Sequence, residues 1–163
     1  AEIMAAGMPF HNIAQDLLGT PNYEAICNDF YSYYANSPSA PYGTIAVTKC
    51  SELEKLTEIV KRINATATEA TRAVQYYDGY TPHIFYDLGD YIEAICNDEG
   101  LLNEFQSQMV ECIPHKASTG QVYAYGFGTI SIDKYSGIST SAPSTNKKCE
   151  SYKETEWYKA TNK

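Results

Sequence analysis

One six-residue word, Glu-Ala-Ile-Cys-Asn-Asp, occurs twice in this chain, at Glu24–Asp29 and at Glu93–Asp98. The likeness extends upstream of both copies, and a further cysteine follows each of them. Self-similarity of this kind is typical of one structural unit used twice. It predicts two repeat units, over about residues 9–50 and 81–112, inside one domain of 163 residues. The alternative is a short coincidental match within two unrelated helices.

The strongest helical pattern lies in the middle of the chain. From Ser51 to Tyr77, apolar residues recur at alternating steps of three and four, which keeps one helix face apolar. A second such pattern runs from about His83 to Cys112, and we expect Gly100 to kink or split it. The two helices should fold back on each other as an antiparallel hairpin. A shorter helix, at about residues 22–35, should pack against them.

After residue 114 the pattern changes. Residues 121–131 alternate aromatic or hydroxyl side chains with small or aliphatic ones, a period typical of a strand. A short strand is also predicted at residues 45–48, and a short helix at 149–161. The predicted fold class is therefore mainly α. It is a disulfide-cross-linked antiparallel helical bundle with a small C-terminal β element.

Five cysteines in a chain of this size are typical of a secreted protein. Bonds within each repeat unit would pair Cys27 with Cys50 and Cys96 with Cys112. A straight helix would hold the second pair about 24 Å apart, far beyond the Cα separation of about 6 Å in a disulfide. The alternative joins Cys27 to Cys96 and ties Cys149 to Cys50 or Cys112. The leftover thiol would be buried, paired between chains, or attached to a pigment or lipid.

Two further features indicate an extracellular location. The chain begins at Ala1 without an initiator methionine, as a mature secreted chain does after its signal peptide is removed. Asn64 opens an Asn-Ala-Thr sequence, which is an acceptor for glycosylation in that compartment. We therefore expect a secreted, acidic glycoprotein.

The overall charge argues against a nucleic-acid partner, because a formal net charge of −8 would repel phosphates. The longest apolar run is also much shorter than the roughly 18 residues that a membrane helix needs. We expect neither a nucleic-acid partner nor a membrane span.

Catalytic and metal-binding patterns are weak. His83 and Asp87 are four residues apart and would share a helix face, and His11 with Asp16 holds the matching place in the first repeat. Two ligands do not form a metal site, so we expect no metal and no cofactor. Asp87 with Asp90 is more simply a solvated helix face than a pair of catalytic carboxylates. Nucleophile elbows and phosphate-binding glycine loops do not appear, although a Cys–His pair remains compatible with the composition.

Fifteen tyrosines offer apolar rings with polar tips, which suit a pocket lining or an interface. An aromatic wall between helices would accept a flat or elongated apolar ligand. The alternative is that these rings fill the core. The candidate lining residues are Phe30, Tyr33, Tyr34, Tyr76, Tyr77, Phe85, Tyr123, Tyr125 and Phe127.

These patterns together predict a secreted, non-catalytic binding protein for an apolar or aromatic small ligand, of the carrier, storage or pigment type. The alternative function is an extracellular assembly or adhesion component. It would self-associate through its tyrosine-rich surface and its fifth cysteine. A hydrolase comes third.

Overall fold

The computed structural model describes residues 23–162, which form short helices and three small antiparallel sheets. The elements are, in chain order, α3 (Tyr23–Ala35), β1 (Thr44–Val47), η1 (Cys50–Glu52), α4 (Leu53–Asn64), β2 (Tyr86–Asp87), α5 (Leu88–Ile95), α6 (Glu99–Cys112), β3 (His115–Ser118), β4 (Gln121–Ala124), β5 (Gly128–Ser131), β6 (Ser139–Thr140), η2 (Lys147–Glu154) and α7 (Glu156–Thr161).

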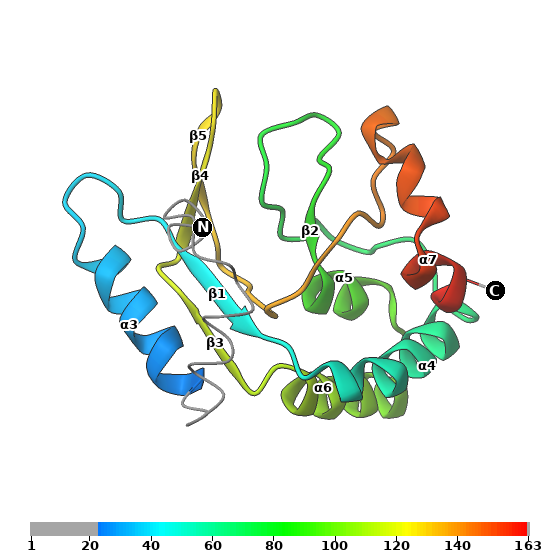
Figure 1. Ribbon diagram of the computed structural model, residues 1–163. Coiled ribbons are helices and arrows are strands. Elements are labelled where there is room, and N and C mark those ends of the chain that lie inside the picture. Colours follow the sequence, from blue (N-terminus) through cyan, green and yellow to red (C-terminus); the bar gives the residue numbers. More distant parts are fainter. Residues whose placement is uncertain (1–22, 163) are drawn as a thin grey trace.

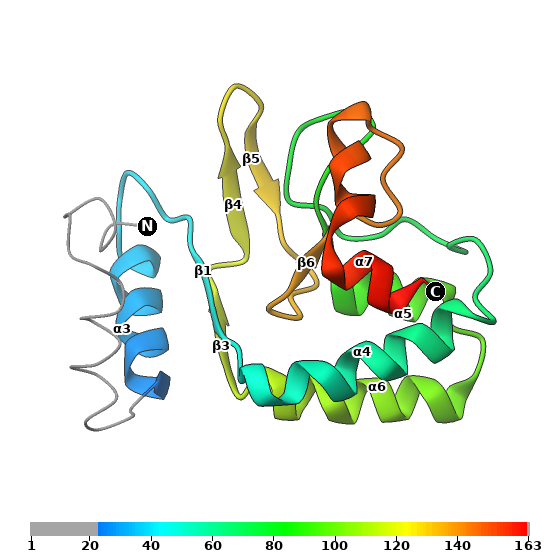
Figure 2. The ribbon, with the colours of Figure 1, turned by 45° about the vertical axis from the view of Figure 1, so that its right-hand side comes forward.

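The strand pair β1–β3 lies between two helical parts of the molecule. Helix α3 packs against β1 and β3 on one side, and the bodies of α4, α5, α6 and α7 gather on the other (Figures 1 and 2). The register pairs Thr44 with Ser118 and Val47 with His115. The β4–β5 hairpin projects away from the α4–α6 layer (Figure 2).

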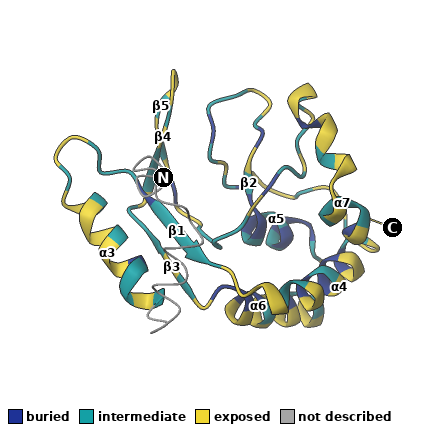
Figure 3. Cartoon of the chain, viewed as in Figure 1, coloured by how far each residue is buried: buried dark blue, intermediate teal, exposed yellow. Residues whose placement is uncertain are grey.

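The hydrophobic core is formed where α4, α5 and α6 meet. The inward face of α4 carries Leu56, Val60 and Ile63 at steps of four and three, while its outer face is exposed (Figure 3). Phe105 of α6 and Ile92 of α5 complete this core and are fully buried. Burial of such side chains stabilises a fold by about 1.5–3 kcal/mol each.

The predicted long helix over residues 51–77 is wrong beyond Asn64, where α4 ends. The following segment leaves the helix axis and runs along α5, where the Thr68 and Thr71 N–H groups donate to the carbonyls of Ile95 and Ala94. Threonine, which is frequent here, is β-branched and favours helices weakly. An apolar period alone therefore overestimated the helix length.

The second predicted helix is split at residues 96–98, not at Gly100. Asp87 caps α5 by accepting from the Asp90 N–H, and Asp98 caps α6 by accepting from the Leu101 N–H. The two copies of the repeated word consequently differ. The first lies wholly inside α3, whereas the second begins in α5 and runs into the cap of α6. The upstream matches at residues 9–22 lie outside the described residues.

The predicted disulfide-cross-linked bundle is wrong. All five cysteines lie within the described residues and all are free. The predicted strand near residues 45–48 appears as β1, but it pairs with β3, so strands form the middle of the molecule and not a C-terminal appendix. The fold therefore belongs to the α/β type.

None of the helices within residues 23–162 is both long and apolar enough to cross a bilayer.

Candidate functional site

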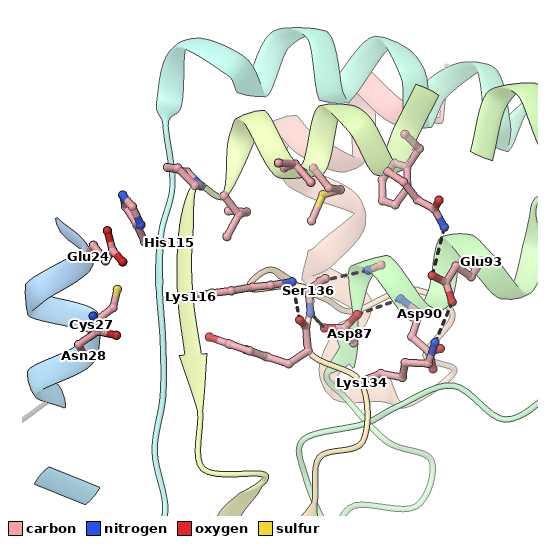
Figure 4. Close-up of a pocket in the computed structure, with 18 residues that line it drawn as sticks. Glu24, Cys27, Asn28, Asp87, Asp90, Glu93, His115, Lys116, Lys134 and Ser136 are labelled. Atoms are coloured by element: carbon pink, nitrogen blue, oxygen red, sulfur yellow. Dashed lines mark hydrogen bonds and ion pairs between the residues drawn. The ribbon is translucent and has the colours of Figure 1, made fainter. Parts of the chain in front are cut away.

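One pocket has a volume of about 570 Å³ and lies beside β3, between α3 on one side and α5 and α6 on the other (Figure 4). Its lining comes from four separate segments of the chain. They contribute Glu24, Cys27, Asn28, Asp87, Gly89, Asp90, Glu93, Phe105, Gln106, Met109, Val110, Ile113, Pro114, His115, Lys116, Lys134, Tyr135 and Ser136.

Asp87 forms the hydrogen-bonded centre of one wall. Its carboxylate is 1% exposed. Oδ1 accepts from the Asp90 N–H at 2.9 Å, while Oδ2 accepts from the Tyr77 hydroxyl at 2.6 Å and from the Ser136 N–H at 2.7 Å. Both oxygens are therefore occupied by donors, so this carboxylate is set to hold segments together.

Asp90 and Glu93 form the charged part of the same wall. Arg72 Nη2 lies 2.7 Å from Asp90 Oδ1, at an ion-pair distance but without hydrogen-bond geometry, and Lys134 Nζ lies 3.2 Å from Glu93. Burial on its own would raise the pKa of Asp90. The Arg72 guanidinium and the Gln75 N–H, which donates to Oδ2 at 2.7 Å, outweigh it and hold that pKa below its ordinary value. Asp90 is thus held in its ionised form, and Arg72 and Lys134 lie at ion-pair distance from Asp90 and Glu93.

Cys27 of α3 and His115 of β3 line the pocket together. Burial raises the pKa of the Cys27 thiol, whereas a nucleophilic cysteine needs a lowered pKa. Burial also raises the pKa of Cys112, with added repulsion from Glu52 and Cys50. Across residues 23–162 no hydrogen bond joins a cysteine to a histidine. The thiols of Cys27 and Cys112 are therefore not activated.

The predicted His83–Asp87 pair does not share a helix face. His83 precedes α5, stacks on Tyr76 with ring centroids 3.5 Å apart, and places Nδ1 3.1 Å from the Asp78 carbonyl. Within the described part of the chain, no group of three or more acidic, histidine or cysteine side chains could hold a metal ion. His11 lies outside that part.

The nine aromatic candidates do not meet in one cavity. Tyr77 and Phe85 line a smaller pocket of about 340 Å³, and Tyr125 at the tip of the β4–β5 hairpin is 92% exposed. The remaining candidates are spread over α3, the loop before β2 and the hairpin, namely Phe30, Tyr33, Tyr34, Tyr76, Tyr123 and Phe127.

The glycosylation candidate Asn64 is at the end of α4. Its Nδ2 donates to the Thr161 carbonyl of α7 at 3.0 Å, so the atom that would carry a glycan is already used to hold α7. Glycosylation at this position stays a prediction.

Sequence reasoning missed the buried carboxylates. The sequence predicts that Asp87 and Asp90 lie on a solvated helix face, but these residues are only 1% and 4% exposed. The available signal was the Asp-Leu-Gly-Asp sequence, which places an N-cap aspartate three residues before another acid. The groups that contact these carboxylates belong to Arg72, Tyr77 and Ser136, which lie elsewhere in the chain and left no local pattern.

No family model matches this sequence, and neither does any curated protein. Solved structures do match. Clostripain from Bacteroides thetaiotaomicron ATCC 29148, in complex with the peptide inhibitor BTN-VLTK-AOMK, is 42% identical with a TM-score of 0.85, and the match covers 95% of this chain and 70% of that one.

Two further solved structures of C11 proteases also match this chain. A secreted C11 cysteine protease of B. thetaiotaomicron, "iotapain", is also 42% identical over 95% of this chain with a TM-score of 0.85, but the match covers only 45% of that protein. An inactive zymogen C11 protease from Parabacteroides distasonis is 30% identical with a TM-score of 0.72, and the match covers 86% of this chain and 43% of that one. The chain thus spans a part of these proteins.

Proposed function

We propose that this chain, which belongs to the clostripain-like C11 family of cysteine proteases, works as part of a proteolytic enzyme. The observation that carries the proposal is the 42% identity over 95% of the chain, at a TM-score of 0.85, with clostripain. The prediction of a non-catalytic carrier, and with it the prediction that favoured a non-enzyme over an enzyme, is wrong on the same finding. The prediction of self-association stays untested.

The described residues are proposed to supply the body of the enzyme and not its nucleophile. The buried thiols of Cys27 and Cys112 have raised pKa values, which favour the unreactive protonated form. The match covers 45% and 43% of two relatives, so those proteins contain much more polypeptide than this chain. We place the reactive cysteine in polypeptide outside residues 23–162.

The proposed substrates are polypeptides cleaved after lysine. The peptide portion of the inhibitor bound to the relative, VLTK, ends in lysine. A net charge of −8 also favours cationic substrates by long-range attraction. Because one relative is described as secreted, we propose an extracellular site of action.

The test is an assay of the protein purified from its natural source, with two fluorogenic peptides that differ only in lysine or glutamine before the reporter. We expect cleavage of the lysine peptide with a kcat/KM at least about a hundredfold higher than that of the glutamine peptide. Cys27→Ser should keep the activity, because that thiol is buried and protonated. No cleavage of either peptide by the full protein would refute the proposal.

A further inference from the structure

Two cysteines lie where the strand pair β1–β3 joins the helical layer. Strand β1 leads into η1 and α4, and α6 leads into β3 at the same corner of the molecule (Figure 2). Cys50 is the first residue of η1 and is exposed, while Cys112 is the last residue of α6 and is fully buried. One thiol is thus accessible to a reagent in solution, and the other is reached from within the protein.

Hydrogen bonds on both sides of Cys50 hold its segment against the last turns of α6. The Lys49 N–H donates to the Cys112 carbonyl at 2.8 Å. Two residues after Cys50, the Glu52 carbonyl accepts from Gln108 Nε2 at 3.0 Å, and Glu52 Oε2 accepts from the same nitrogen at 3.2 Å. Gln108 and Cys112 are four residues apart, so they lie on one face of the helix. Cys50 is therefore held between two contacts with the face that carries Cys112.

The surroundings of the two sulfurs agree with this placement. Burial raises the pKa of the Cys112 thiol, and the negative charges of Glu52 and Cys50 raise it further. Because charges shift a pKa from short range, both side chains lie near that thiol. Cys50 Sγ is 4.0 Å from the Thr48 carbonyl oxygen, and a thiol is a weak donor. Little therefore opposes rotation of the Cys50 side chain toward Cys112.

We propose that Cys50 and Cys112 form a reversible disulfide when the folded protein meets a small-molecule disulfide such as oxidised glutathione. The bond is not part of the resting fold, in which both thiols are free. It also joins a pair that none of the pairings predicted from the sequence contained. The inference goes beyond the proposed proteolysis and does not depend on it.

The oxidation is a thiol–disulfide exchange in two steps. The Cys50 thiolate attacks one sulfur of the oxidant, so a mixed disulfide forms, the sulfur–sulfur bond of the oxidant breaks and one glutathione thiolate leaves. The Cys112 thiolate then attacks the Cys50 sulfur, and the second glutathione thiolate leaves. In total the two protein thiols lose two electrons and two protons, and the oxidant becomes two thiols.

Peptide mapping of the full protein, purified from its natural source, tests the bond. The protein is reduced, freed of the reductant, incubated with oxidised glutathione and then alkylated. Cleavage after lysine, arginine and glutamate leaves each of the five cysteines of this chain in a peptide of its own. Because proximity raises the effective concentration of Cys112, the peptide pair that joins it to Cys50 should be at least about tenfold more abundant than any pair containing Cys96.

Two variants of the full protein separate proximity from reactivity. Cys50→Ser should leave Cys112 unoxidised, because the buried thiol does not meet the oxidant directly. Cys96→Ser is the matched control, since Cys96 is only partly buried and precedes α6, at the opposite end of that helix from Cys112. This variant should form the bond between Cys50 and Cys112 as the unmodified protein does.

Hydrogen exchange gives a second, local readout. The new bond should hold the Lys49 N–H on the Cys112 carbonyl, so oxidation should slow exchange of the Lys49 amide by at least about tenfold. The same slowing is expected in Cys96→Ser and none in Cys50→Ser.

Three results would overturn the proposal. The first is a folded protein with no bond between Cys50 and Cys112, whether Cys50 stays a thiol or stops at the mixed disulfide. The second is a bond from Cys50 to another cysteine. The third is a bond between Cys50 and Cys112 that forms only in urea, because it would then belong to the unfolded chain. Each readout is independent of whether the protein cleaves peptides.

Discussion

At the scale of single residues, one buried carboxylate with a lowered pKa makes the stability of the protein depend on pH. Asp90 is 4% exposed and stays ionised because Arg72 and the Gln75 N–H outweigh the effect of burial. A carboxyl whose folded pKa lies below its unfolded value contributes stability above the unfolded pKa, near 4. That contribution is lost as the pH falls through the folded pKa.

Asp90→Asn should therefore destabilise the protein by about 1–3 kcal/mol at pH 7, because a charge-assisted contact to Arg72 is lost. The difference from the unmodified protein should shrink as the pH falls from about 4 through the lower folded pKa of Asp90, because the unfolded state binds the proton first and the native carboxyl becomes neutral only below its folded pKa. Urea unfolding at pH 7 and pH 3 measures both values.

Glu93→Gln is the matched control, because Glu93 is on the same helix and its side chain is 31% exposed. Its effect at pH 7 should be smaller than that of Asp90→Asn. A loss for Asp90→Asn that is the same at both pH values would contradict the ionic explanation.

At the scale of elements, helix ends were predictable only where a local signal marks them. The sequence predicted the helix at residues 22–35 and the strand at 45–48 to within about one residue, because turn residues surround both. It missed the end of α4, since the stop at Asn64 is set by hydrogen bonds to α5 and α7 that lie far along the chain. The burial of Asp87 was not predicted either, because the groups that donate to its carboxylate also lie elsewhere in the chain.

The start of α5 offers a test of such a long-range contact. A Cβ on Gly89 would lie 2.7 Å from the Ser136 Cβ, so the helix can approach the 134–138 segment only with glycine there. Alanine normally stabilises a helix relative to glycine. We expect the reverse here, a loss of about 1–3 kcal/mol for Gly89→Ala, because the segment must move.

Thermal unfolding measures this loss, with Gly100→Ala in α6 as the comparison. A Cβ on Gly100 would meet only Oδ1 of the Asp98 cap, at 3.2 Å, so a shift of a few tenths of an ångström that keeps the bond from the Leu101 N–H is enough. Gly100→Ala should be neutral or mildly stabilising. Equal effects of the two alanines would show that helix propensity, and not the contact with Ser136, decides the outcome.

At the scale of the whole molecule, the composition led to the wrong source of stability. Five cysteines in 163 residues suggested cross-links, whereas all five thiols are free and the core of α4, α5 and α6 holds the fold. Cysteine number carries no information on which side chains approach each other. The apolar stripes contained most of the core residues but not Ile59 and Ile113, so much of the core was predictable even though the fold class was not.

The unfolding midpoint should consequently be the same with and without a thiol reductant. One disulfide typically stabilises a protein by about 2–4 kcal/mol, which would move the midpoint by several degrees. Calorimetry in the two buffers measures it, with a disulfide-bonded protein as the positive control. A lower midpoint in the reductant would mean that cross-links form in solution after all.

Many of the contacts described above join residues that are made at very different times. Gly43 pairs with Thr119, 76 positions later, and Asn64 holds Thr161, 97 positions later. Contacts this distant in sequence delay folding. On the ribosome, Asn64 of α4 must wait for 97 further positions before Thr161 of α7 can cover it, so nascent chains should depend on chaperones until α7 has emerged.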